Sequence, residues 1–127
     1  KVAGSRIIVV VGHTRCGAVK GAIEQVKAGK MTGLLGKLRP AIAESGSFSG
    51  NGKNARESYA DLVAMKNVLH SVKEIRKGSA ILREMEENGE ISIVGCMYDV
   101  ENGRIIFFPH ATETTTNAAT PETQEKY

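Results

Sequence analysis

The sequence predicts an α/β fold with a mainly parallel central sheet, flanked by helices, whose last strand is antiparallel to its neighbour. Two apolar runs separated by helical patterns, Ile7–Val11 and Ile91–Val94, predict the parallel strands. The first run is unbroken and β-branched, which is typical of a strand buried on both faces. A turn-forming segment, Asp99–Gly103, leads into Arg104–Phe108 and predicts a closing hairpin.

Helical patterns follow the first strand. Gly17–Ala28 is a stretch of small and helix-compatible residues that ends at Gly29. Leucines at helical spacing predict a second helix over Thr32–Glu44, which Pro40 should interrupt or kink. Residues 45–52 are rich in Gly and Ser and predict a loop.

The longest predicted helix runs from about Asn54 to Arg76. Asn54 and Glu57 have the spacing of a capping box at its start, and Gly78 follows its end. We expect His70, on this helix, to be solvated or locally hydrogen-bonded. The apolar residues expected to face the core recur at intervals of three and four, and they are Leu62, Met65, Leu69 and Val72, with Val68 and Ile75 beside them.

A short helix and the second strand complete the predicted order. Ser79 is expected to cap a helix over Ala80–Glu87, which Asn88 and Gly89 should stop. The strand itself is expected over Glu90–Met97.

The composition predicts one domain over residues 1–109 and a flexible tail over residues 110–127. The tail is rich in Thr and has no large apolar residue before Tyr127, so it buries too little to offset the entropy of ordering. Residues 1–109 carry sixteen Lys and Arg against eleven Asp and Glu, whereas the tail carries one against three. Because the basic residues are scattered and aromatic residues are few, we expect a weak attraction for small anions and no nucleic-acid partner.

The sequence also predicts a cytoplasmic protein. Its apolar runs fall well short of the roughly 20 residues of a membrane helix, and no signal-peptide pattern is visible, so no membrane partner is expected. Two cysteines, Cys16 and Cys96, are too few for a disulfide framework and suit a reducing compartment. Because the chain starts at Lys1, directly before the first strand, we expect it to be a fragment or a processed chain.

Two candidate metal ligands, His13 and Cys16, follow the first strand in an H-x-x-C spacing. They occupy a strand-to-helix turn, and in open α/β sheets ligands bind at the carboxyl ends of strands. Imidazole nitrogen and thiolate sulfur are ligands that zinc prefers. The alternative from the residues alone is that Cys16 is a small packed residue and His13 an ordinary turn residue.

A phosphate-binding loop is the other function that a strand, a glycine turn and a helix could indicate. Gly12 and Gly17 match the two glycines of that motif, but Ala18 and Val19 stand where Lys and Ser or Thr would hold phosphate and magnesium. We therefore reject nucleotide binding.

The order of motifs resembles the β-class carbonic anhydrases. The similarity covers nearly everything from Val2 to Phe108. The motifs that carry it are GHTRCGAVKGA at Gly12–Ala22, LLGKLRPAI at Leu34–Ile42, the helix around Asn67 and Val68, GSAILREM at Gly78–Met85 and IVGCMYDVENGRI at Ile93–Ile105.

The resemblance implies a zinc lyase that converts carbon dioxide to bicarbonate reversibly. It makes His13 and Cys16 two of three protein ligands to zinc, which lowers the pKa of water to about 7 so that the water attacks carbon dioxide. It also places the backbone amide of Gly17 near the substrate or the metal-bound sulfur, and it implies a homodimer or a higher homo-oligomer.

One departure from the family pattern bears on activity. The third ligand in the family is a cysteine in an upstream C-x-D-x-R motif, and this sequence begins downstream of that position, so no catalytic Asp-Arg dyad is present. Cys96 stands at a small-residue position of its strand, and we expect it and Asp99 to be structural. We therefore expect an N-terminally incomplete domain with poor activity.

Three readings remain open within this resemblance. The intact protein is a carbonic anhydrase, a non-enzymatic protein (a scaffold or regulatory module with an incomplete zinc site, or a half-site that needs a second polypeptide), or a hydrolase of carbon disulfide or carbonyl sulfide. The residues do not discriminate among these substrates.

Overall fold

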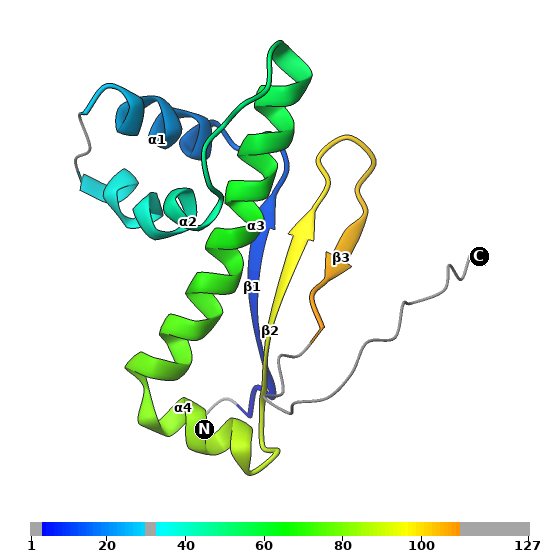
Figure 1. The fold of residues 1–127 in the computed structure, drawn as a ribbon. Helices are drawn as coiled ribbons and strands as arrows, with labels where there is room; N and C mark the ends of the chain where they lie inside the picture. Colours follow the sequence, from blue (N-terminus) through cyan, green and yellow to red (C-terminus); the bar gives the residue numbers. More distant parts are fainter. Residues whose placement is uncertain (1–3, 30–32, 110–127) are drawn as a thin grey trace, which may run out of the picture.

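The computed structural model describes residues 4–29 and 33–109 of the chain (Figure 1). The predicted tail, residues 110–127, lies outside the described residues. In chain order the elements are β1 (Ile7–His13), α1 (Gly17–Lys27), the 3-10 helix η1 (Gly33–Leu38), α2 (Arg39–Glu44), α3 (Lys53–Gly78), α4 (Ala80–Glu87), β2 (Ser92–Tyr98) and β3 (Ile105–Phe107).

The three described strands form one sheet in the order β1-β2-β3, which confirms the predicted α/β fold. β1 and β2 are parallel, and their register runs from Ile7 opposite Ser92 to His13 opposite Tyr98. β3 is antiparallel to β2, with Phe107 opposite Cys96. The carboxyl ends of the two parallel strands therefore meet at one edge of the molecule, and His13 lies at that edge.

Helix α3 packs across one face of this sheet, and two strand glycines allow it to come close. A Cβ atom at Gly12 would lie 2.6 Å from Cγ2 of Val68, and one at Gly95 would lie 2.7 Å from Cγ1 of the same residue. Any larger side chain at these glycines would push the helix away from the strands. The side chains of α3 that are buried are Ala60, Val63, Ala64, Val68 and Val72.

The predicted core stripe of α3 was therefore partly wrong. Val68 and Val72 are buried, but Leu69 is exposed, and Ala60 and Ala64 belong to the core. A count of large apolar residues overlooked alanine, which packs where a helix approaches a sheet or another helix closely. The predicted stripe was consequently rotated around the helix relative to the real one.

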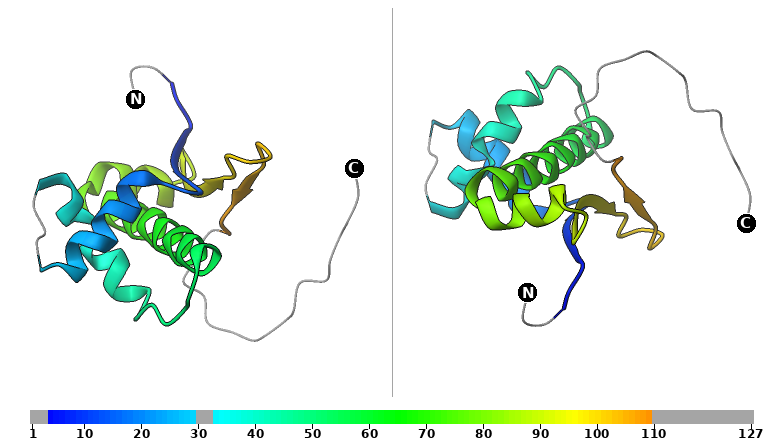
Figure 2. Two further views of the ribbon diagram at one scale, coloured as in Figure 1. Left: turned by 90° about the horizontal axis from the view of Figure 1, so that it is seen from above. Right: turned by 90° about the horizontal axis from the view of Figure 1, so that it is seen from below.

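The opposite face of the sheet is open in the part of the chain that the structure describes. Side chains alternate along β1, so Ile8 and Val10 pack toward α3 whereas Ile7 and Val11 are 55% and 59% exposed. The prediction that this strand is buried on both faces was wrong for the described residues. In the views from above and from below, the helices lie on one side of the strands (Figure 2).

Two further local predictions needed correction. Pro40 does not kink a helix: it lies in the first turn of α2, where a missing N–H costs no hydrogen bond, and a 3-10 helix precedes it. Helix α3 begins at Lys53 after Gly52 and has no side-chain cap, so Asn54 and Glu57 do not form the predicted capping box. Glu57 instead pairs with residues of the neighbouring turn and of α1.

Other predictions were confirmed. α1 ends at Lys27, just before Gly29, whose φ of 67° is the left-handed conformation that glycine adopts readily. Ser79 caps α4, because its Oγ accepts a 3.3 Å hydrogen bond from the N–H of Leu82. Among the described helices, none is both long and apolar enough to span a bilayer.

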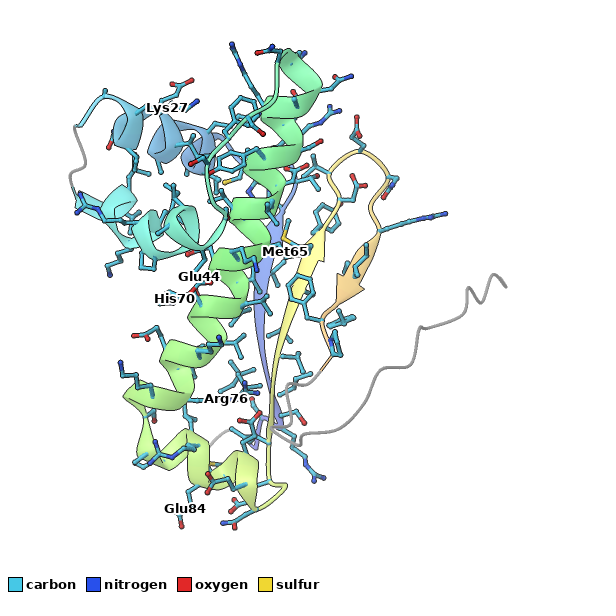
Figure 3. All side chains as sticks on the ribbon, viewed as in Figure 1. Lys27, Glu44, Met65, His70, Arg76 and Glu84 are labelled. Atoms are coloured by element: carbon cyan, nitrogen blue, oxygen red, sulfur yellow. The ribbon has the colours of Figure 1, made fainter. Side chains whose placement is uncertain are left out.

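An ion pair connects α3 and α4 to β2 at the end of the sheet opposite His13. Arg76 lies near the carboxyl end of α3 (Figure 3), and its Nε and Nη2 donate hydrogen bonds of 2.6 and 2.8 Å to the two carboxylate oxygens of Glu86 on α4. Arg76 Nη2 also donates to the carbonyl of Ile93, and the N–H of Ile93 donates to Glu86. The pair thus connects two helices to the backbone of β2, and the bond to Glu86 raises the pKa of Arg76 above its ordinary value.

Candidate metal centre

The two predicted zinc ligands lie at opposite ends of one short turn. His13 is the last residue of β1, and Cys16 is the N-cap residue of α1, with extended backbone angles (φ −65°, ψ 117°). The Cys16 thiol is free and half-buried, and it packs against the core formed by α1, α2 and α3. A thiolate at this position would gain from the partial positive charge of the helix N-terminus.

The ring of His13 is oriented by its own turn. Nδ1 lies 2.9 Å from the carbonyl oxygen of Thr14. Since a carbonyl only accepts, Nδ1 carries a proton, and in the neutral form of the ring this leaves the lone pair of Nε2 for a metal ion. This is the arrangement in which a backbone carbonyl fixes the tautomer of a ligating histidine.

Arg15 lies between the two candidate ligands in a conformation that side chains rarely adopt. Its φ is 56°, the left-handed region, and it is the one non-glycine residue with positive φ among those described. Its N–H donates a 2.7 Å hydrogen bond to Oδ1 of Asp61 on α3. Its guanidinium contacts the carboxylates of Glu57, at 3.7 Å, and of Glu101. Three carboxylates from two distant segments therefore hold the centre of the turn.

Thr14 attaches the same turn to the end of β2. Its N–H donates a 3.0 Å hydrogen bond to the carbonyl of Tyr98, and its Oγ1 accepts a 3.1 Å bond from the N–H of Val100. The turn after β2 is itself organised by Asp99, whose carboxylate accepts bonds from Glu101 and Asn102. Asp99 therefore has the structural role that the sequence predicted.

Gly17 is the first residue of α1, and its surroundings are open. A Cβ added there would meet no heavy atom within 4 Å, so packing alone does not require glycine. Cys96 lies in the middle of β2, opposite Val11, and is 1% exposed. The structure therefore confirms Cys96 as a buried thiol and leaves it away from the turn that carries His13 and Cys16.

His70 lies on the face of α3 turned away from the sheet (Figure 3). Together with Cys16 it lines an open cleft of about 760 Å³ between α1, η1 and α3. The prediction that His70 is solvated or locally hydrogen-bonded, and not a ligand, stays a prediction.

The donor set fits zinc as part of a site. One imidazole nitrogen and one thiolate are ligands of the kinds that zinc takes in three-ligand catalytic centres. Within residues 4–29 and 33–109, no group of three His, Cys, Asp or Glu side chains is placed to hold a metal ion.

Sequence reasoning missed the residues that shape this turn. Arg15 was visible between the two candidate ligands, but its partner Asp61 is 46 positions away and carries no local signal. Glu57 was assigned to a capping box, although its carboxylate pairs with Arg15 and Lys20. The available signal was the charged residue Arg15 between the two candidate ligands, because a charged side chain in such a turn needs a partner of opposite charge.

Comparison with known proteins identifies the family. The sequence profile of carbonic anhydrase matches residues 1–105. Carbonic anhydrase 2 of Mycobacterium tuberculosis is 28% identical over 104 residues, which are 82% of this chain and 49% of that protein. The chain thus spans about half the length of the curated relatives it matches.

Solved structures agree with this assignment at the level of the fold. The β-carbonic anhydrase CcaA superposes with a TM-score of 0.64 at 20% identity, over 82% of this chain and 51% of that one. A tetrameric β-carbonic anhydrase of Sordaria macrospora gives a TM-score of 0.60 at 22% identity, over 80% and 51% of the two chains. Since the profile, the curated relative and the fold agree, the chain belongs to the β-class carbonic anhydrase family.

Proposed function

We propose that the intact protein is a zinc-dependent carbonic anhydrase that interconverts carbon dioxide and bicarbonate. The observation that carries the proposal is the strand-to-helix turn, where His13 offers Nε2 and Cys16 offers a half-buried thiol within one H-x-x-C segment. The curated relatives are named carbonic anhydrases, and this chain matches about half of their length.

In this proposal His13 and Cys16 hold the zinc ion. Zinc, when bound, supplies a Lewis acid that makes water nucleophilic at neutral pH. The backbone carbonyl of Thr14 keeps the ring of His13 in the ligating tautomer, and Arg15 with its carboxylate partners keeps the spacing between the two ligands. The N–H of Gly17, in the open first turn of α1, is the group proposed to contact substrate or the ligand sulfur.

The third protein ligand must come from outside the described residues, because two ligands leave zinc weakly held. We therefore propose that the 127-residue chain alone is poorly active and binds zinc less tightly than a three-ligand site would. Cobalt substitution tests this directly, since the thiolate-to-cobalt charge-transfer band reports on Cys16 without any need for turnover.

The experiment combines metal titration with stopped-flow carbon dioxide hydration. His13→Ala and Cys16→Ser should abolish the remaining metal binding, whereas the matched controls His70→Ala and Cys96→Ala should leave the stoichiometry unchanged. Gly17→Ala should bind metal normally, because its Cβ meets no atom, and any loss of turnover in the completed protein would then report contact with substrate. Brisk turnover that survives loss of His13 would refute the proposal.

A non-catalytic scaffold or regulatory module is the alternative from a different class. The observation that favours it is the incomplete ligand set among the described residues. Failure of the intact protein to hydrate carbon dioxide while it binds no zinc would support the scaffold. If the protein is an enzyme, assays of carbon disulfide and carbonyl sulfide hydrolysis on the same preparation distinguish these substrates from carbon dioxide.

We also propose that the protein self-associates through the open face of the sheet. Ile7, Val9 and Val11 are exposed on β1, and Ile105 and Phe107 are exposed on β3 at positions that the register puts on the same face. An apolar surface of this kind is stabilised when a partner covers it, and the Sordaria macrospora relatives are tetrameric. Val9→Lys should shift the mass in analytical ultracentrifugation toward the monomer, whereas a wild-type monomer at high concentration would contradict the proposal.

The two free thiols bear on location. Cys16 and Cys96 are both unpaired, and Cys16 must stay reduced to bind zinc. A reducing compartment meets this requirement, and we propose the cytoplasm. Fractionation of cells that produce the intact protein tests this assignment.

A further inference from the structure

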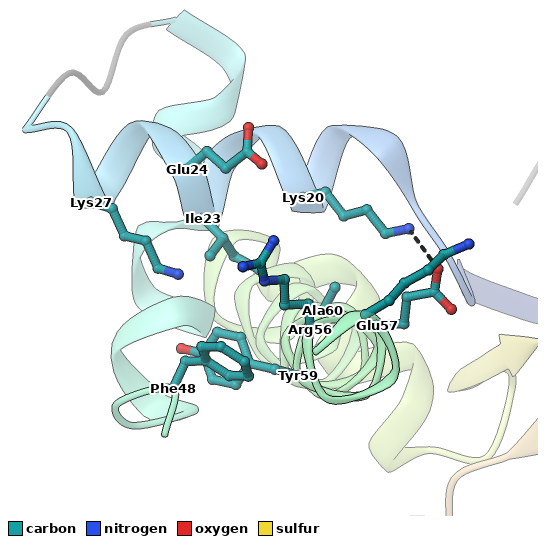
Figure 4. Close-up of a pocket in the computed structure, with 10 residues that line it drawn as sticks. Lys20, Ile23, Glu24, Lys27, Phe48, Arg56, Glu57, Tyr59 and Ala60 are labelled. Carbon is teal, nitrogen blue, oxygen red and sulfur yellow. Dashed lines mark ion pairs between the residues drawn. The ribbon is translucent and has the colours of Figure 1, made fainter. Parts of the chain in front are cut away.

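A second concave site lies against α1, and none of its lining residues belongs to the cleft that contains Cys16. It is a cleft of about 220 Å³ between α1, the segment 45–52 and the first turns of α3 (Figure 4). None of the proposed zinc ligands lines it. It is therefore separate from the centre described above, and its lining indicates a ligand of its own.

The floor of this cleft is aromatic. Phe48 and Tyr59 stand with their ring centroids 5.3 Å apart at an angle of 48°. The hydroxyl of Tyr59 donates a 2.7 Å hydrogen bond to the carbonyl of Gly46, which anchors that ring. Buried Ile23 and Ala60 complete the apolar surface. The two tilted rings give a rigid apolar wall, and a flat apolar group can stack on one ring and contact the other.

The rim of the cleft is cationic. The ammonium group of Lys27 lies 5.0 Å from the centroid of the Phe48 ring. Arg56 extends from α3 into the gap between α1 and the two rings (Figure 4). Neither cation has a carboxylate partner within 4.0 Å among the described residues, whereas Lys20 on the same rim pairs with Glu57 at 3.7 Å.

We propose that this cleft binds a small monocarboxylate with a flat apolar body, such as an aromatic acid. The guanidinium of Arg56 matches the two oxygens of a carboxylate, and Lys27 adds a second positive charge. The body of the ligand lies on Phe48 and Tyr59, where its burial adds to the electrostatic attraction. Glu24, also on the rim, disfavours a ligand with a second negative charge.

Benzoate is the probe, and it is compared with three molecules that do not combine a carboxylate with a flat apolar body. Acetate has the charge without the flat body, benzamide has the body without the charge, and inorganic phosphate has the charge with tetrahedral geometry. We expect saturable shifts of the amide signals of residues 20–27 and 56–60 in nitrogen-15 correlation spectra. Benzoate should bind at least about tenfold more tightly than each comparison molecule, which corresponds to ~1.4 kcal/mol.

Variants then assign the contacts. Arg56→Gln should weaken benzoate binding about tenfold or more, and Phe48→Leu should weaken it while leaving the weak attraction for acetate unchanged. Arg39→Gln is the matched control, because Arg39 is an exposed arginine on α2 outside the cleft. Circular dichroism of each variant establishes that it is folded.

Several outcomes would overturn the proposal. Equal affinity for benzoate and acetate, or an equal effect of Arg39→Gln and Arg56→Gln, would show general attraction to a basic surface. Binding of benzamide as tightly as benzoate would show that Arg56 plays no part. Absence of saturable benzoate binding in folded wild-type protein would exclude the site. Because the readout is binding of benzoate and needs neither metal nor turnover, the result is independent of carbonic anhydrase activity.

Discussion

The backbone N–H of Arg15 donates a 2.7 Å hydrogen bond to Oδ1 of Asp61, and this bond holds the middle of the H-x-x-C turn in a left-handed conformation. Cys16 follows Arg15 directly and His13 lies two residues before it, so the contact of Arg15 with α3 bears on the relative position of the two proposed ligands. A helix that covers the sheet therefore also shapes the candidate metal centre.

Asp61→Ala should loosen this turn, because it removes the acceptor of the Arg15 N–H. The expected loss is about 1 kcal/mol in the free energy of unfolding, since the bond lies near the surface. The free energy of cobalt binding should weaken by more than the free energy of unfolding does. Asp61→Asn keeps an oxygen acceptor and is the control, so equal effects of the two substitutions would show that the charge matters and the hydrogen bond does not.

Arg15→Gly and Arg15→Ala separate backbone strain from side-chain pairing. Both variants remove the contacts with Glu57 and Glu101. Only alanine retains a Cβ, and with it the conformational strain of a φ of 56°. The glycine variant should be the more stable of the two by about 1 kcal/mol in urea denaturation. Equal stability of the two variants would show that the turn relaxes to a negative φ.

Gly12→Ala should disturb the packing of α3 on the sheet. The new Cβ would lie 2.6 Å from Cγ2 of buried Val68 and 2.7 Å from Sδ of Met97, so the helix or the strand must move. We expect a loss of about 1–3 kcal/mol in the free energy of unfolding. Gly36→Ala, where a Cβ meets nothing within 4 Å, is the control for thermal or chemical denaturation.

Arg76→Gln should destabilise the protein more than Arg83→Gln does. Arg76 makes a bidentate pair with Glu86 on side chains that are 25% and 18% exposed, and it also bonds to the backbone of β2. We expect a loss of about 1–3 kcal/mol. Arg83 pairs with Glu87 at 4.0 Å on the surface, and its loss should cost at most about 0.5 kcal/mol.

The pH dependence of this pair has a definite sign. Hydrogen bonding to Glu86 raises the pKa of Arg76 above its value in the unfolded chain. A raised pKa on a basic group contributes stability below the unfolded pKa, which is lost only as pH rises through the folded one. The difference in stability between wild type and Arg76→Gln should therefore be constant from neutral pH to about pH 11. A decrease of that difference between pH 8 and about pH 10 would contradict the assignment.

Local patterns were sufficient to predict the order of elements and the place of the candidate site. The β-branched run before Gly12 and the helix-compatible run after Gly17 put His13 and Cys16 on a strand-to-helix turn, because each pattern is read within a few residues. The cap at Ser79 and the hairpin after Asp99 were predictable for the same reason.

What the sequence by itself determined is therefore the order of the main helices and strands, their parallel and antiparallel pairing and the place of two residues of the kinds that zinc prefers as ligands. Only the tertiary structure decided which side of α3 is buried, that Ile7 and Val11 are exposed, and that Arg15 is held by a carboxylate 46 positions away. These features depend on contacts between segments remote in the chain. Residue periodicity reports the alternation of side chains along a strand or helix, but it carries no information on which neighbour covers each face.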